Sequence, residues 1–176
     1  MPCAIAIIRP PMKLSEKVPN EEIYFAGAIV PRRCTDIWLE RVQGNHPTME
    51  EFGVTREQVS RKVAADLTNA ALLSTLACVD IGLGRKEEAV SEGKRATEMV
   101  PISKDALQGP GLVYNLALVY AWADEPDLAF EQLSILIKVP NNCQVTYGTL
   151  KVDPSWDPLR KDPRFEKCFA ELAPRQ

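Results

Sequence analysis

Histidine and cysteine, two residue types often used for metal binding and nucleophilic catalysis, are few in this chain and lie far apart in the sequence. The single histidine, His46, precedes Pro47 in a turn-like segment. Without a second histidine and an acidic partner at suitable spacing, it supports neither a zinc site nor a catalytic triad. The cysteines form no Cys-x-x-Cys pair, which predicts free thiols in a reduced, intracellular protein. They are Cys3, Cys34, Cys78, Cys143 and Cys168.

Two further patterns invite a chemical interpretation and do not support it. The run from Gly82 to Lys86 contains a fragment of a glycine-rich phosphate loop, but it follows a helical pattern and lacks the required spacing. The acid pairs Glu21-Glu22 and Glu87-Glu88 are adjacent, so a helix would point their side chains about 100° apart. Paired catalytic carboxylates must instead converge on one pocket. We therefore predict a protein that is not an enzyme and needs no cofactor and no metal.

Composition limits the partners. The 176 residues include 45% hydrophobic residues and carry a formal net charge of -3, with acidic and basic residues interleaved. No basic stripe is present, so we expect no nucleic-acid partner. The apolar stretch at residues 3–8 ends at Arg9-Pro10-Pro11 and is too short for a signal sequence or a membrane span. We expect a cytoplasmic protein with no membrane partner.

The chain divides into three parts. Residues 1–54 read as an irregular N-terminal arm, with short helices expected at 21–30 and 34–43. Residues 55–143 carry helical periodicity, beginning with a capping-box spacing from Thr55 to Gln58 that opens a helix reaching Leu67. Further helices are predicted at 70–83, 86–100, 109–123 and 125–138. Residues 144–176 predict a loop with a short strand at 145–150, then a last helix at 164–172.

Within 55–143, two pairs of helices share a pattern of small and large residues. Small residues are expected where two helices approach closely, and Gly84 and Pro101 fit a sharp turn and a helix end. The first pair carries Leu76-Ala77, Gly84, Ala89, Ala96 and Pro101. The second pair carries Leu116-Ala117, Tyr120, Ala129 and Leu133 at matching intervals.

This pattern resembles the tetratricopeptide repeat (TPR), which has about 34 residues per unit. The units would cover about 70–103 and 110–143, and Asp80, Gly93 and Leu136 depart from the family pattern. The resemblance implies an all-α fold, in which antiparallel helical hairpins stack as a short right-handed solenoid. A C-terminal helix would cap it, with Trp156, Leu159, Phe165, Phe169 and Leu172 covering the last hairpin.

The resemblance also implies that the first helix of each hairpin lines a concave groove. Tyr114, Leu118 and Trp122 form one stripe of that face, with Asn115 beside it, and the first unit contributes Ser74 and Cys78. Two interpretations stay open. The groove binds an extended peptide or an amphipathic helix, or the stripe is core, filled by the chain itself, with residues 1–20 as one candidate. Serine and cysteine at positions 74 and 78 disfavour a clamp for chaperone C-termini.

The leading hypothesis is a non-catalytic scaffold that binds a protein or peptide partner. The segment 152–165 also resembles the end of TPR regions in bacterial signalling proteins. The alternative is therefore a regulatory or sensor tail acting with a kinase, cyclase or transcription regulator. An enzyme with an unrecognised site is a third class, and it requires a deep polar pocket. Because few hairpins are present, a homodimer is a further possibility for completing the stack.

Overall fold

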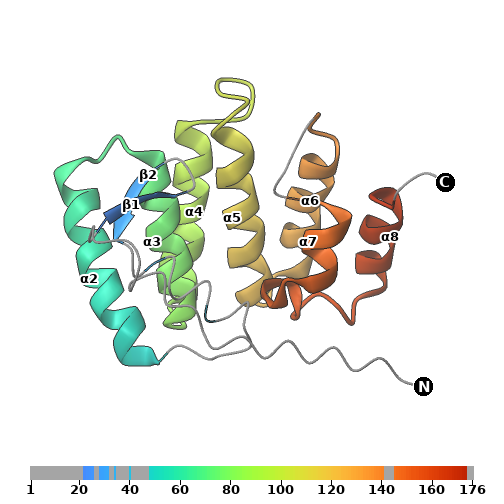
Figure 1. Ribbon diagram of the computed structural model, residues 1–176, viewed down its shortest axis with the longest axis horizontal. Helices are drawn as coiled ribbons and strands as arrows, with labels where there is room; N and C mark the ends of the chain where they lie inside the picture. Colours follow the sequence, from blue (N-terminus) through green and yellow to red (C-terminus); the bar gives the residue numbers. More distant parts are fainter. Residues whose placement is uncertain are drawn as a thin grey trace, which may run out of the picture.

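Helices make up nearly all of the structure, a computed structural model that describes residues 22–25, 28–31, 34, 40, 48–140 and 145–173. The helices follow one another across the molecule in sequence order (Figure 1). The predicted helical class is confirmed, and a two-stranded ribbon is the exception within the described residues. No helix of that part of the chain has the length and apolar character needed to cross a bilayer.

The ribbon replaces the helix expected at residues 21–30, so that prediction was wrong. Strand β1 (Glu22–Phe25) pairs antiparallel with β2 (Ala28–Pro31), with Glu22 opposite Pro31 and Phe25 opposite Ala28. The physical reason lies in the residue types, because β-branched and aromatic residues such as Ile23, Tyr24 and Val30 favour strands. In the helix expected at 34–43, the structure describes only positions 34 and 40, and both are helical.

Helix α2 (Met49–Ala65) begins six residues before the predicted start at Thr55. Its N-cap is Thr48, whose hydroxyl accepts a hydrogen bond from the Glu51 amide at 3.2 Å while the Glu51 carboxylate accepts from the Thr48 amide at 2.8 Å. The Thr55 hydroxyl is buried and donates to the Glu51 carbonyl at 2.8 Å. Both Thr-x-x-acid/amide spacings exist in the sequence, and the earlier one forms the capping box. The boundary between 54 and 55 therefore lies inside a helix.

The four helices after α2 agree with their predicted bounds to within one residue at each end. They are α3 (Ala70–Gly82), α4 (Lys86–Met99), α5 (Gly109–Trp122) and α6 (Pro126–Ile137). The turns between α3 and α4 and between α5 and α6 are each three residues long, so both pairs run antiparallel. Gly84 in the first turn has φ 75° and Asp124 at the matching place in the second has φ 65°. The two hairpins thus share a left-handed turn position.

Small residues lie where the helices approach. Ala77 and Ala89 are fully buried with Val119, at the place where α3, α4 and α5 meet. Gly93 departs from the repeat pattern because α5 takes its space: a Cβ built there would lie 2.9 Å from Leu116 Cδ1. Leu116 of α5 fills the space that a large side chain at position 93 would occupy.

The residues that break the repeat spacing form a compact turn between α4 and α5, visible where it projects beyond the helix ends (Figure 1). The Asp105 carboxylate accepts from the amides of Leu107 and Gln108 at 2.8 and 2.9 Å. The turn closes on Gly109, where a Cβ would lie 2.7 and 2.8 Å from the Cα and N of Ile102. Glycine is needed here for close backbone approach.

The C-terminal segment contains α7 (Tyr147–Val152), the 3-10 turn η2 (Pro154–Trp156) and α8 (Pro163–Glu171). The strand predicted at 145–150 was wrong, because Thr146 and Thr149 cap each other reciprocally and start a helix. The last helix is confirmed. The predicted capping residues all pack into the apolar cluster of the second hairpin, as Trp156, Leu159, Phe165, Phe169 and Leu172.

Enlarging Ala89 tests the close packing of the first hairpin. We expect Ala89→Leu to lower the free energy of unfolding by about 1–3 kcal/mol, because a fully buried site has no room for three more carbon atoms. Urea denaturation measures the change. Ala64→Leu, on an exposed position of α2, is the control and should change the stability little. Equal stability of the two variants would contradict the packing described here.

Two glycine-to-alanine changes should have opposite effects. Gly109→Ala should lower the free energy of unfolding by about 1–3 kcal/mol, because the new Cβ meets the backbone of Ile102. Gly53→Ala, inside α2 and with nothing within 4 Å of its Cβ position, should raise it by about 0.5–1 kcal/mol through helix propensity. Thermal and urea unfolding of both variants check the signs. A stabilising Gly109→Ala would rule out the tight α4–α5 turn.

Candidate functional site

The predicted groove residues lie on two neighbouring helices, with Ser74 and Cys78 on α3 and the others on α5. One hydrogen bond joins the two sets: the Asn115 amide Nδ2 donates to Ser74 Oγ at 3.0 Å. Ser74 is almost fully buried, whereas Asn115 and Cys78 are half-buried. The structure therefore brings the predicted groove residues of α3 and α5 together, and the hydrogen bond between Asn115 and Ser74 links the two helices.

Tyr114 is engaged by the C-terminal segment of the chain. Its ring meets that of Trp156 edge to face, with centroids 5.4 Å apart at 83°. Its hydroxyl donates a hydrogen bond of 3.4 Å to the Asp153 carboxylate. Burial, followed by the charge of Asp153, raises the pKa of Tyr114 well above its usual value. Edge-to-face pairs of this kind add about 0.5–1.5 kcal/mol to the apolar burial.

Trp122, two turns further along α5, contacts the same segment differently. Its indole Nε1 donates a hydrogen bond to the backbone carbonyl of Ser155 at 2.8 Å, while 37% of the side chain stays exposed. Leu118 lies between Tyr114 and Trp122 and is half-buried. The stripe on α5 is therefore covered in part by residues 153–156. The proposed filler at residues 1–20 lies outside the described residues.

The covering segment is held by its own local contacts. The Arg160 guanidinium donates to the backbone carbonyls of Leu150 and Asp153, both at 2.9 Å, and to the Asp157 carboxylate at 2.6 Å. The Asp153 carboxylate also accepts from the Ser155 amide at 2.9 Å and starts the 3-10 turn. These bonds fix the backbone that presents Ser155 and Trp156 to α5.

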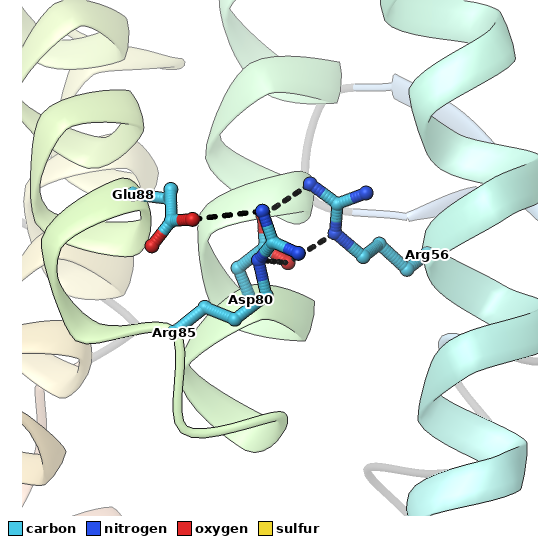
Figure 2. Close-up of polar contacts among 4 residues, drawn as sticks. All are labelled: Arg56, Asp80, Arg85 and Glu88. Carbon is cyan, nitrogen blue, oxygen red and sulfur yellow. Dashed lines mark hydrogen bonds and ion pairs between the residues drawn. The ribbon is translucent and has the colours of Figure 1, made fainter.

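The sequence analysis missed a charged cluster at the junction of α2, α3 and α4 (Figure 2). The Asp80 carboxylate of α3 is fully buried and accepts from Arg56 Nε of α2 at 2.5 Å and from Arg56 Nη2 at 3.3 Å. Arg85, in the turn to α4, lies 3.4 Å from Asp80 and also donates to Glu88 at 2.8 Å. The cluster thus ties three elements to one carboxylate.

One signal in the sequence pointed to this cluster. Asp80 is the only charged residue of α3, and it stands where the repeat pattern has an aromatic residue. A buried carboxylate requires cationic partners, because leaving its charge unpaired costs several kcal/mol. The partner Arg56 is 24 positions away, so the local pattern did not reveal it.

The remaining chemical candidates fall in ordinary structural places. Gly82 packs beneath the ring of Phe52, which occupies the space of any Cβ there, and Gly84 forms the helix turn. The adjacent acids Glu87 and Glu88 are both exposed. Among the described cysteines, Cys34 and Cys168 are free thiols, and burial raises the pKa of Cys34 to about 12. His46, Cys3 and Cys143 lie outside the described residues.

Neutralising Asp80 tests whether the cluster holds the helices together. Asp80→Asn should lower the free energy of unfolding by about 3 kcal/mol, because Arg56 and Arg85 lose the charge that offsets their partial burial. Asp157→Asn, which removes an exposed partner of Arg160, is the matched control and should cost less than about 1 kcal/mol. Equal losses in urea denaturation would mean that the buried cluster is no stronger than a surface ion pair.

Comparison with known proteins adds no relative to this picture. No protein-family model, no characterised protein and no solved structure matched the chain. Within the described part of the chain, no group of three or more His, Cys, Asp or Glu side chains is arranged to hold a metal ion.

Proposed function

We propose that this protein is a non-catalytic interaction scaffold, a short TPR-like solenoid that binds a peptide or protein partner along one face of α3 and α5. This inner face carries the predicted groove residues Ser74, Cys78, Tyr114, Asn115, Leu118 and Trp122. The observation that carries the proposal is the seating of residues 153–156 on α5. There the chain recognises a polypeptide segment by an aromatic contact at Tyr114 and a side-chain hydrogen bond from Trp122 to a backbone carbonyl. These are the two kinds of contact with which grooves hold peptides.

Exposed and half-buried residues on the same face could bind a partner by the same kinds of contact. Trp122 keeps 37% of its side chain exposed beyond the segment that it contacts. Cys78, Ile81 and Leu118 are half-buried on α3 and α5. Aromatic residues with one polar group are enriched where interfaces concentrate their binding energy. A partner would use Trp122 as its central contact and extend toward the α3 half of the face.

The repeated geometry of the two hairpins supports the solenoid part of the proposal. Gly84 and Asp124 adopt the same left-handed turn at matching positions. Ala89 of α4 and Ala129 of α6 are fully buried at matching positions of their helices. Stacked repeats of this kind present extended surfaces that are used for protein recognition.

The alternative keeps this architecture and makes it the regulatory or sensor tail of a bacterial signalling system, with a kinase, cyclase or transcription regulator as partner. The resemblance of residues 152–165 to the end of such regions favours it. In that case the same inner face would bind a folded domain. A peptide selection separates the two readings.

The scaffold proposal is tested by peptide-display selection against the full chain, beside the variants Trp122→Ser and Ile135→Ser. We expect the wild type and Ile135→Ser to enrich one shared motif, and Trp122→Ser to lose at least about tenfold in affinity for it. Ile135 is the matched control because it is a large apolar residue exposed on α6 to a similar degree. Tyr114 is left intact, since its ring supports the buried Trp156.

Enrichment that Trp122→Ser retains in full would place the binding surface elsewhere and contradict the proposed face. An absence of enrichment on all three proteins would contradict peptide binding and favour a folded partner. Circular dichroism of each variant verifies that the helices are intact before the affinities are compared.

A further inference from the structure

The carboxyl group of Glu92, on α4, lies beside Asp80 of the charged cluster, and one of its oxygens has no hydrogen-bond donor in the described part of the chain. Its Oε2 atom is buried, and no hydrogen-bond donor reaches it within the described residues. Buried polar atoms are nearly always hydrogen-bonded, so an ionised Glu92 leaves an acceptor unsatisfied. The position is therefore unfavourable for the charged form of this side chain.

Four other charged residues of the described chain meet at this junction. Asp80 of α3 faces Glu92 and already accepts from Arg56 of α2. Arg85, in the α3–α4 turn, is shared between Asp80 and Glu88 of α4. Helix α5, which also packs on α4, contains no Asp, Glu, Lys, Arg or His. Two arginines thus face three carboxyl groups, so one carboxyl group lacks a cationic partner.

A proton on Glu92 resolves both problems. The protonated carboxyl becomes a donor, and the Asp80 carboxylate beside it is an available acceptor. Two carboxyl groups that share a site avoid ionising together, and one of them keeps its proton. Asp80 holds the two hydrogen bonds from Arg56, so Glu92 is the partner that takes the proton.

We propose that the junction between α2 and the first hairpin is a proton-controlled joint, closed while Glu92 is protonated and loosened when Glu92 loses its proton. The ionised Glu92 carboxylate competes with Asp80 for Arg56, the residue through which α2 holds the cluster. Helix α2 then keeps its apolar contacts with α3, such as Phe52 against Gly82 and Val79.

The direction of the pH effect follows from the shift of the Glu92 pKa. Burial, followed by the charge of Asp80, raises the pKa of Glu92 from 4.5 to about 7. A group whose pKa is raised in the folded state contributes stability that is complete below about pH 4.5 and is lost as pH rises through about 7. Asp162, whose pKa is lowered to about 2 mainly by Arg164, acts in the opposite sense and only in acid.

Amide hydrogen exchange of the full chain at about pH 5.5 and about pH 8.5, corrected for intrinsic exchange, tests the joint. We expect the protection of α2 to fall by about tenfold relative to that of α6 at the higher pH. Glu92→Gln keeps a donor that cannot ionise, and its α2 should stay protected at both values. Glu98→Gln, at an exposed position of the same helix outside the cluster, is the control and should keep the response of the wild type.

An unchanged α2 in the wild type, or an equal loss of protection in Glu92→Gln, would overturn the proposal. A direct titration covers the case in which Glu92→Gln does not fold. The side-chain carboxyl carbon of Glu92, followed by NMR in the wild-type protein, should titrate near pH 7. A midpoint near the ordinary value of 4.5 would contradict a protonated Glu92 at the junction.

Discussion

Close approach of helix backbones at small residues is the constraint on which this architecture depends. Ala77, Ala89 and Val119 occupy the place where α3, α4 and α5 meet, and none of them has exposed surface. Because these side chains are short, α3 can pack against α4 and α5 at once. The hydrogen bond from Asn115 to Ser74 is possible only at that separation. The candidate binding face is thus a consequence of the alanine positions.

The helices from 70 to 138 could be predicted because local signals and the packing pattern agree there. Turn residues at Gly84 and Glu125-Pro126, the helix end before Pro101 and the helix start at Gly109-Pro110 all mark the observed bounds. Prediction failed where two local solutions compete. Thr48 and Thr55 both begin a capping-box spacing, and the structure forms the first. The segments at 21–30 and 145–150 are too short for their periodicity to distinguish a helix from a strand.

The aromatic stripe on α5 could be predicted from the sequence, and the segment that covers part of it could not. The aromatic stripe on α5 follows from helical spacing, since Tyr114, Leu118 and Trp122 are four residues apart. Its contact with residues 153–156 depends on the bends after α7 and on Arg160, which anchors two backbone carbonyls. Such side-chain to backbone bonds leave no periodic trace in a sequence. Asp80 is recognisable in the sequence because it is the only charged residue of α3. Its partner Arg56 is 24 positions away, and no local pattern identifies it.

Helix α3 carries residues of both the charged cluster and the proposed binding face. Cys78 of the inner face and Asp80 of the charged cluster are two residues apart, so they lie on different sides of one rigid helix. Phe52 of α2 covers Gly82 at the end of that helix, where any side chain would displace the ring. A change in the seating of α2 therefore acts on the helix that carries half of the proposed binding face. Helix α3 thus holds the Asp80 cluster on one side and half of the proposed binding face on another.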